Sequence, residues 1–362
     1  MTPSQQEQRK KEHIAIAERL YRQPEFARDQ FADVRISHPS LPDTKLASVH
    51  LEQMLFNRPI NYPIYINAMT GGTNQALTIN QKLAQLAAHF KIPMAVGSMS
   101  ILKHEPELAA SFTVVRQQNP DGVVFANVGA DHPTDFAEEM VQLLQADALQ
   151  IHLNAAQEFA MPEGDQDYLW STKLAHLQAT IGQTTPLIAK EVGFGMNAAT
   201  ISQLLQLGLQ NIDVSGISRT NFIEIENHRR KTALISDYSD FGLTVIESLL
   251  QRLNVQQALN MRPEITFASG GIRTPWQAVK CLALGGDLVG MSAYFLHLVL
   301  HHDFDEMSVL FGAWLAEFKG IFAMLGCNNV ADLRKLSLIL SPELFSFAQQ
   351  TGLDWATFSG QR

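Results

Sequence analysis

The stretch Ile265–Arg273, with the sequence ITFASGGIR, and the stretch Leu288–Ala293, LVGMSA, decide between the folds open to this chain. Both are apolar, β-rich runs that end in small and polar residues. In a (β/α)8 barrel the loops after the seventh and eighth strands often bind phosphate, because glycines let the backbone come close and a helix N-terminus offers free N–H groups. Two glycines alone also fit a plain turn. The two strand ends together favour a phosphate site in a barrel.

Six further β-rich runs precede these two, which makes eight. Most are near-continuous apolar segments, as is typical of strands covered on both faces. Helical patterns lie between them, for example at 80–90, 135–144 and 275–284. This alternation also allows a flavodoxin-like or Rossmann sheet, but eight β/α units in a chain of this length favour a TIM barrel. The six runs are Ile64–Ala68, Met94–Ser98, Val123–Gly129, Ala148–Asn154, Leu187–Gly193 and Asn211–Gly216.

We therefore expect a single α/β domain over residues 1–362. It would consist of an N-terminal extension at 1–60, the TIM barrel at 61–304 and a helical tail at 305–362. The segment 218–264, after the sixth run, is longer than one connection to the next strand requires. Its length predicts a lid or loop over the mouth of the barrel.

The composition limits the partners of the chain. Of its 362 residues, 46% are hydrophobic and 17% are charged, and the formal net charge is −9. The apolar content suffices for one large core. The acidity argues against nucleic acid as a partner but leaves room for a local basic site. The low charge points to subunit assembly, and we expect a homo-oligomer, either a tetramer or an octamer.

The sequence also predicts a cellular location. The N-terminal sequence lacks the apolar core of a signal peptide. The most apolar stretch, Leu288–Leu300, is shorter than the roughly 20 residues that cross a bilayer. The two cysteines, Cys281 and Cys327, do not form a CxxC pair. We expect buried thiols in a cytoplasmic protein with no membrane partner.

Two strand ends carry polar groups that suit a ligand. Thr70, in the stretch NAMTGG, and the amides after it could hydrogen-bond a flat heterocycle such as a flavin ring. Lys190 lies within the apolar run LIAKEVG, and a lysine that points into a barrel is costly unless an anion or polar ligand receives it. There it would place a positive charge near the N1/O2 edge of a flavin. If Lys190 points outward, it can instead pair with Glu191 or another carboxylate.

The fourth run continues into HLNAAQE, residues 152–158. Strand alternation puts His152 and Asn154 on one face, with Gln157 and Glu158 in the loop beyond. One carboxylate beside amide and imidazole groups suits a Mg²⁺ ion that keeps several waters and meets substrate phosphates. Ordinary loop polarity is the alternative. Zinc is disfavoured, because no Cys/His ligand set is at hand.

Two charged runs lie outside the strands. Arg9, Lys10 and His13 fall on a predicted N-terminal helix, where Arg9 and His13 share a face at i, i+4. Such a run is usually a solvated face, and diphosphate binding is the alternative. The run 301–303, HHD, has no further ligand near it in the sequence, and we interpret it as surface at a helix end.

Taken together, these segments resemble the type 2 isopentenyl-diphosphate isomerases. The resemblance runs in order from Arg9 to about Leu296. Its order and spacing make it specific, and it implies an FMN-binding TIM barrel that interconverts isopentenyl and dimethylallyl diphosphate. Reduced FMN would act as acid and base, NADPH would be the reductant, and Mg²⁺ would bind the diphosphate of the substrate. The matching motifs are RKKEHI, NAMTGG, VGS, ANVG, HLNAAQE, KEVGFG, DVSG, ASGGIR and VGMSA.

The resemblance also implies roles for single residues. Glu158 matches the Mg²⁺ ligand, and His152, Asn154 and Gln157 would support a reaction in which no protein group is assigned as acid or base. The residues that match substrate-binding positions are Arg9, Lys10, His13, His152, Asn154 and Gln157. The residues that match FMN-binding positions are Ala68, Met69, Thr70, Ser98, Asn127, Lys190, Ser215, Thr220, Gly271, Ile272, Arg273, Ser292 and Ala293.

The chain departs from the family pattern at 217–219, Ile-Ser-Arg, where the family usually has two glycines before the threonine that matches Thr220. We expect the Arg219 side chain to hydrogen-bond the flavin phosphate instead. At 241–242, Phe-Gly replaces a usual Trp-Gly. Two alternatives stay open. One is an FMN-dependent 2-hydroxy-acid oxidase or dehydrogenase, which would need a histidine beside Arg273, and the other is an FMN-binding barrel with impaired catalysis.

Overall fold

A computed structural model gives the fold for residues 5–22, 29–161, 164–218, 221–229, 238 and 241–358. Eight parallel strands close into a barrel in chain order, from β4 to β11, and β11 pairs with β4. This closure confirms the TIM barrel and excludes the open Rossmann sheet. The barrel strands are β4 (Ile64–Ile66), β5 (Met94–Ala95), β6 (Val124–Gly129), β7 (Ala148–Leu153), β8 (Leu187–Glu191), β9 (Asn211–Asp213), β10 (Ile265–Ser269) and β11 (Leu288–Met291).

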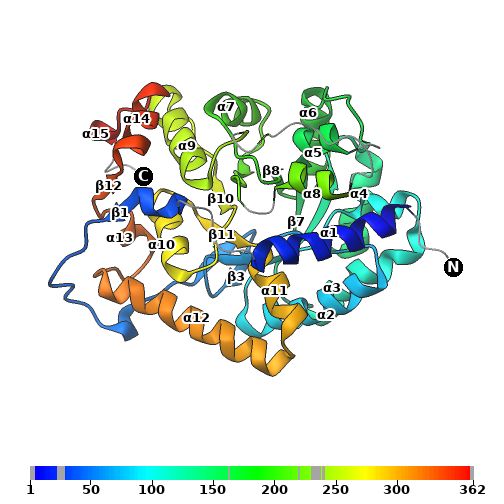
Figure 1. Cartoon of the computed structure of the whole chain (residues 1–362), viewed down its shortest axis with the longest axis horizontal. Coiled ribbons are helices and arrows are strands. Elements are labelled where there is room, and N and C mark those ends of the chain that lie inside the picture. Colours follow the sequence, from blue (N-terminus) through cyan, green and yellow to red (C-terminus); the bar gives the residue numbers. More distant parts are fainter. Residues whose placement is uncertain are drawn as a thin grey trace.

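Helices follow each strand and surround the barrel (Figure 1). Several begin at the capping residues that favour helix starts, as at Thr244 and Thr274, whose side chains and those of Glu247 and Gln277 form capping boxes. The three predicted helical patterns are confirmed. The helices are α2 (Asn74–Phe90), α3 (Ala110–Gln118), α4 (Thr134–Leu144), α5 (Ala155–Ala160), α6 (Ser171–Ala179), α7 (Ala198–Gln206), α8 (Phe222–Arg229), α9 (Val245–Leu259), α10 (Pro275–Ala283) and α11 (Ala293–His301), with the 3-10 turns η3 (Met99–Lys103), η4 (Pro106–Ala109) and η5 (Ile181–Gln183).

The connection after β9 is more than the lid or loop that its length predicts. It holds α8, which packs against α5 and against the N-terminal helix α1 (Gln5–Arg22), and it also holds α9, the barrel helix of this unit. Figure 1 shows α1 crossing in front of the barrel, with α8 and α11 beside it. Residues 230–237 and 239–240 of this connection lie outside the described part of the chain.

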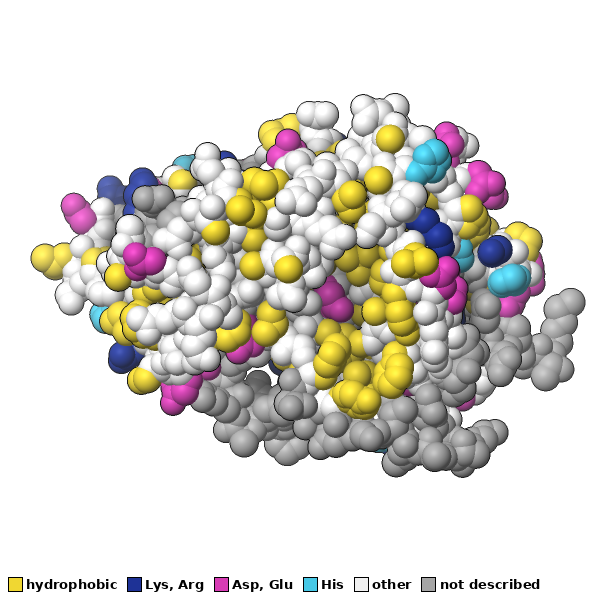
Figure 2. Space-filling view, turned by 90° about the horizontal axis from the view of Figure 1, so that it is seen from above, with side chains coloured by type: hydrophobic (Ala, Val, Ile, Leu, Met, Phe, Trp, Pro, Cys, Tyr) yellow, Lys and Arg dark blue, Asp and Glu magenta, His cyan; other side chains and the backbone are white. Residues whose placement is uncertain are grey.

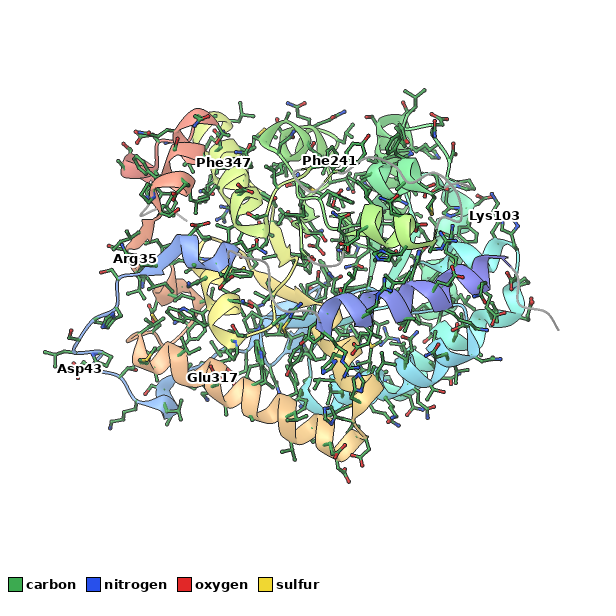
Figure 3. The ribbon with its side chains drawn as sticks, in the orientation of Figure 1. Arg35, Asp43, Lys103, Phe241, Glu317 and Phe347 are labelled. Atoms are coloured by element: carbon green, nitrogen blue, oxygen red, sulfur yellow. The ribbon has the colours of Figure 1, made fainter. Side chains whose placement is uncertain are left out.

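A strand of the N-terminal extension pairs with a strand of the C-terminal tail. Strand β1 pairs antiparallel with β12, so that Val34 lies opposite Leu340. Figure 3 shows Arg35 of β1 and Phe347 of α14 on the same side of the molecule, far from Lys103. The additional elements are η1 (Gln30–Asp33), β1 (Val34–Ile36), η2 (Leu46–Ser48), β2 (Gln53–Leu55), β3 (Arg58–Ile60), α12 (Phe304–Met324), α13 (Val330–Leu333), β12 (Leu338–Leu340), α14 (Pro342–Gln350) and α15 (Trp355–Phe358). The tail is therefore helical apart from the short strand β12.

Helix α12 is the one helix in the described residues that is long and apolar enough to cross a membrane. In this fold it packs against α10 and α2 and buries Phe311, Phe318 and Phe322 completely. One face of α12 is therefore part of the packed core. Figure 2 shows one face of the molecule, on which charged side chains are sparse, as the low charged fraction of the sequence leads one to expect.

The lower half of the barrel interior is an apolar plug. Tyr65, Phe125 and Phe267 are fully buried, with ring centroids 5.4 to 6.1 Å apart; Phe267 meets both other rings edge to face. The β2–β3 hairpin closes this end with Leu55 and Ile60. Because strand side chains alternate, the inward residue two positions further along each strand lies one layer higher, towards the C-terminal ends. That next layer is polar. The two cysteines are buried free thiols, which confirms their prediction.

Candidate active site

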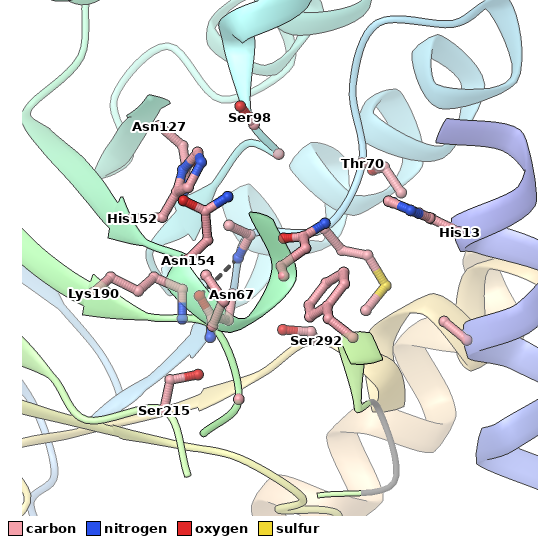
Figure 4. A pocket seen from close by; sticks show the side chains of 18 of the residues that line it. His13, Asn67, Thr70, Ser98, Asn127, His152, Asn154, Lys190, Ser215 and Ser292 are labelled. Atoms are coloured by element: carbon pink, nitrogen blue, oxygen red, sulfur yellow. Dashed lines mark hydrogen bonds between the residues drawn. The ribbon is translucent and has the colours of Figure 1, made fainter. Parts of the chain in front are cut away.

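A cavity of about 430 Å³ opens at the C-terminal ends of the barrel strands. This volume falls within the range of about 300–1,000 Å³ that is typical of sites for small molecules and cofactors. Strand ends and their loops line one part of it, and α1 lines the other. Figure 4 shows His13 entering from α1 on one side, and His152 and Lys190 from the barrel strands on the opposite side.

A buried carboxylate, Asp213, organises the floor of the cavity. It accepts hydrogen bonds from Tyr65 Oη at 2.6 Å, from Ser269 Oγ at 2.7 Å and from Lys190 Nζ at 3.0 Å, and its side chain is 0% exposed. The backbone N–H of Ser215 donates a further bond at 3.2 Å. Asp213 therefore joins the apolar plug to the polar layer above it and holds the lysine in place.

The structure settles the direction of Lys190. Its side chain points into the barrel, lines the cavity and is almost fully buried. Its carboxylate partner is Asp213, and from Glu191 it reaches only the main-chain oxygen, at 3.0 Å. The Glu191 carboxylate instead accepts from the amides of Gly193 and Phe194, and burial raises the pKa of Glu191 to about 8. The inward orientation is the one that suits a polar ligand.

His152 is an uncharged imidazole at neutral pH. Burial lowers its pKa to about 4. Its Nδ1 lies 2.8 Å from the side-chain oxygen of Asn127, whose amide nitrogen donates to Gln150 at 3.0 Å. This chain leaves the Asn127 oxygen to accept from Nδ1–H, so that Nε2 is the unprotonated nitrogen. The ring thus offers an acceptor, not a positive charge.

Glu158 lies in the mouth of the cavity at the start of α5. Its carboxylate accepts from the Asn154 amide at 2.7 Å and from the Asp165 backbone N–H at 2.8 Å, and burial raises its pKa. Asp131 and Gln157 line the same cavity. The structure therefore brings the predicted carboxylate and amide side chains together. Asp131 and Asp165, which the sequence analysis did not single out, lie in the same cavity.

Helix α1 brings its cations to the cavity. Arg9, Lys10 and His13 all line it, so their helix face is not a simple solvated surface. Lys10 Nζ donates to the main-chain oxygen of Ser98 at 2.9 Å. Burial, and next the charge of Arg9, lowers the pKa of Lys10 to about 7. A lysine whose pKa is lowered by burial in a cavity is a candidate functional residue.

His13 has a protein partner already. Its Nε2 lies 2.8 Å from Glu226 of α8, and Glu226 also pairs with Arg229. Burial lowers the pKa of His13, although the Glu226 carboxylate opposes this shift. The contact joins α1 to α8 across the mouth, and this link between distant segments is not visible in the sequence.

The loops after β10 and β11 form the other end of the cavity. Gly270 has φ +117°, and a Cβ there would lie 2.2 Å from the main-chain oxygen of Gly216, so only glycine fits. Gly271 and the start of α11, at Ser292, line the cavity beside it. The Arg273 guanidinium lies 4.1 Å from the ring centre of Tyr21 on α1 and donates to its main-chain oxygen at 3.3 Å.

The loop after β4 is held by polar contacts. The Thr70 hydroxyl donates to Asn80 at 2.5 Å, and the Thr70 main-chain oxygen accepts from Gly97 at 2.8 Å. A ligand would therefore meet the backbone of this loop and the half-buried Met69 more readily than the hydroxyl. Ser98 starts the next turn, η3, and its hydroxyl pairs with Ser100 at 2.7 Å.

The structure brings almost every candidate residue to this one cavity, while their roles stay predictions. Thr220 and Arg219 lie outside the described residues. Phe241 stands half exposed, with its ring 5.6 Å from that of Phe194. The candidates that line the cavity are Arg9, Lys10, His13, Ala68, Met69, Thr70, Ser98, Asn127, His152, Asn154, Gln157, Glu158, Lys190, Ser215, Gly271, Ile272, Arg273, Ser292 and Ala293.

Comparison with known proteins shows which family this chain belongs to. No family model matches the sequence. The isopentenyl-diphosphate delta-isomerase of Staphylococcus saprophyticus is 41% identical over 355 residues, which cover 98% of this chain and 99% of the relative. That of Limosilactobacillus reuteri is 39% identical over 354 residues, which cover 98% and 100%.

Solved structures resemble the fold. A flavocytochrome b2 variant has a TM-score of 0.68 at 15% identity, covering 97% of this chain and 88% of that one. A mandelate oxidase variant with an FMN adduct has a TM-score of 0.58 at 15% identity, covering 91% and 92%. At 15% identity these structures support the barrel fold and nothing about the function. The isopentenyl-diphosphate delta-isomerases named above match this chain over almost its whole length. The chain therefore belongs to the type 2 isopentenyl-diphosphate delta-isomerase family.

Proposed function

We propose that the cavity binds FMN and a prenyl diphosphate side by side and interconverts isopentenyl diphosphate and dimethylallyl diphosphate. The observation that carries this proposal is that two surfaces whose chemistry suits anions meet at one barrel mouth. One is the glycine-rich loop at Gly270 with the start of α11, and the other is the cationic face of α1. One surface suits the phosphate of a cofactor, and the other suits the phosphorylated end of a substrate.

The residues present fit FMN. Gly270 and Gly271 line the cavity, and the N-terminus of α11 faces the same space. Lys190, held by Asp213, presents a fixed cation from the floor. When bound in its reduced form, FMN supplies the proton donor and acceptor for the reaction, and NADPH would be its reductant. Among the solved structures with this fold, the mandelate oxidase variant carries FMN in an adduct.

The diphosphate would lie against α1. A small alkene offers few groups to grip, so binding energy must come from the charged end of the substrate. Arg9 and Lys10 point into the cavity, and Lys10 has lost much of its solvation there. Binding an anion would restore its charge. His13 would contribute through its contact with Glu226, which holds α1 against α8.

His152 and Asn154 would line the part of the cavity that receives the substrate carbons next to the diphosphate. The His152 ring, oriented by Asn127, is neutral and forms an uncharged wall beside the hydrocarbon of the substrate, and Asn154 is fixed by Glu158. Gln157 lies one turn along in α5 and lines the same wall. A neutral wall here avoids a competing positive charge, so that the diphosphate stays with α1.

The carboxylate cluster at the mouth fits Mg²⁺. Glu158 and the nearby Asp131 offer oxygen ligands, and the open side of the cavity allows the ion to keep several waters. Mg²⁺ would neutralise the diphosphate. Glu158→Gln would keep the hydrogen bond from Asn154 but remove the charge, and we expect the rate to fall about a hundredfold with the Mg²⁺ requirement lost. Near-normal activity would remove Glu158 from this role.

We further propose that the protein is cytoplasmic and acts as a homo-oligomer, a tetramer or an octamer, with no nucleic-acid or membrane partner. The sparse surface charge supports assembly. No observation favours a 2-hydroxy-acid oxidase: Arg273 is engaged with Tyr21 of α1, and the histidines that line the cavity come from other segments.

The test is a visible spectrum and an isomerisation assay on the purified protein. We expect a yellow protein that isomerises isopentenyl diphosphate when FMN, NADPH and Mg²⁺ are all present, with activity lost when each is omitted in turn. A protein that stays colourless with FMN would refute the cofactor. A yellow protein without isomerisation under these conditions would instead favour a barrel impaired in catalysis.

A further inference from the structure

A cluster of two imidazoles and a carboxylate joins α1 to α11 outside the cavity. His297 and His301 lie one turn apart on α11, and both contact the same oxygen of Glu18 on α1. His297 Nδ1 lies 2.9 Å from Glu18 Oε1, and His301 Nε2 lies 2.8 Å from it. The sequence interpretation of the histidine run as helix-end surface holds for His301, at the end of α11, but it missed Glu18 and His297.

The geometry of this cluster is close to that of a metal site. One ligand atom from each of the three side chains lies within 4.8 Å of the others. Tetrahedral zinc, with bonds of about 2.0–2.1 Å, needs ligand atoms about 3.3 Å apart. A widening of about 0.5 Å between Glu18 and the two rings is therefore sufficient.

Two further observations favour an ion. The second carboxylate oxygen of Glu18, Oε2, is buried and has no hydrogen-bond partner among the described residues, and such atoms are costly. The His297 ring is held in place by Tyr21, with ring centroids 4.8 Å apart. The His297 and His301 side chains remain 31% and 37% exposed, so an ion can enter from solvent and keep a water as fourth ligand.

We propose that Glu18, His297 and His301 bind a divalent transition-metal ion of the zinc class. Two imidazoles and one carboxylate match the ligand set of such ions, whereas Mg²⁺ prefers oxygen ligands only. The site is separate from the proposed Mg²⁺ position at Glu158. Its three ligands are all protein side chains, so metal binding can be tested without FMN or substrate and independently of the proposed reaction.

The consequence of binding is a clamp on α1. This helix carries Arg9, Lys10 and His13 into the cavity, while Glu18 lies nearer its C-terminal end. Tyr21 contacts both His297 and Arg273, so the clamped end also adjoins the glycine-rich loop. An ion bound between α1 and α11 would therefore fix the helix that grips the substrate.

The test uses Zn²⁺ and Co²⁺ alone on the full-length protein. We expect about one Zn²⁺ per chain by calorimetry, and a Co²⁺ visible spectrum typical of a four-coordinate nitrogen and oxygen site. His301→Gln and Glu18→Gln should each weaken binding by more than about tenfold, because even the loss of an outer-sphere partner costs that much. His302→Gln is the matched control, since His302 lies next to the cluster but pairs with Glu306.

Hydrogen exchange provides the second measurement. Zn²⁺ should slow amide exchange over residues 5–22 in the unaltered protein and in His302→Gln, but not in His301→Gln. The His301 side chain is partly exposed, so its replacement should leave the fold intact. Absence of binding, or equal binding by His301→Gln and the unaltered protein, would overturn the proposal. Binding without slower exchange in α1 would overturn the clamp.

Discussion

The buried pair of Lys190 and Asp213 allows a sharp test of the site floor. In Asp213→Asn the side chain keeps its size but loses the charge that faces Lys190 Nζ at 3.0 Å. The lysine would then be a buried cation without a counter-charge, since its side chain is only 6% exposed. Breaking a buried pair by removing one partner costs about 3–5 kcal/mol. We expect a loss of that size in the free energy of unfolding.

The assay is guanidinium unfolding followed by circular dichroism, with FMN absent so that binding does not contribute. Lys335→Gln is the control. It breaks the Lys335–Asp332 pair, which has a similar distance of 2.8 Å, but its lysine is 75% exposed. That change should leave the free energy of unfolding nearly unchanged, because an exposed ion pair contributes little. If Asp213→Asn costs no more than this control, water reaches the floor and the pair does not organise the site.

Three further predictions concern residues that line the cavity. Because the pKa of Lys10 is lowered to about 7, its ammonium form is lost as pH rises through 7, so affinity for pyrophosphate should fall over pH 7–9 in calorimetry; Lys10→Arg should abolish this trend, and a flat profile in the unaltered protein would contradict it. His152 should stay neutral from pH 5.5 to 8, because burial lowers its pKa to about 4; an NMR titration of its ring with a midpoint near the usual 6.5 would disprove the assignment. Gly270→Ala should destabilise the fold by at least about 2 kcal/mol, because the new Cβ meets the Gly216 oxygen, whereas Gly320→Ala in α12, with nothing within 4 Å, should be neutral or stabilising by up to about 1 kcal/mol; equal melting temperatures would count against the close approach.

The barrel could be predicted because each strand is a local signal. The runs at 187–193 and 265–271 carry their apolar residues and their terminal glycines within a few positions. Since parallel strands in a barrel end at one rim, polar residues at strand ends could be assigned to one cavity before their contacts were known. The inward position of Lys190 followed from the same logic, although its alternative could not be dismissed.

The partners of those residues could not be predicted, because they come from distant parts of the chain. Asp213 and Lys190 lie on neighbouring strands, 3.0 Å apart, and only the pairing register brings them together. The contact of His13 with Glu226 depends on how α1 crosses α8. The sequence held one signal for Asp213, because alternation along the predicted run 211–216 would put it on the same side as Ser215.

The pairing of β1 with β12 has a consequence for synthesis of the chain. Val34 emerges early from the ribosome, but its partner Leu340 is among the last residues to be made. The barrel units can assemble in chain order before β1 has its partner. The β1–β12 pair can form only after translation is nearly finished. The N-terminal arm should therefore dock late, and a nascent chain that stalls before Leu338 should expose its early segment to proteases.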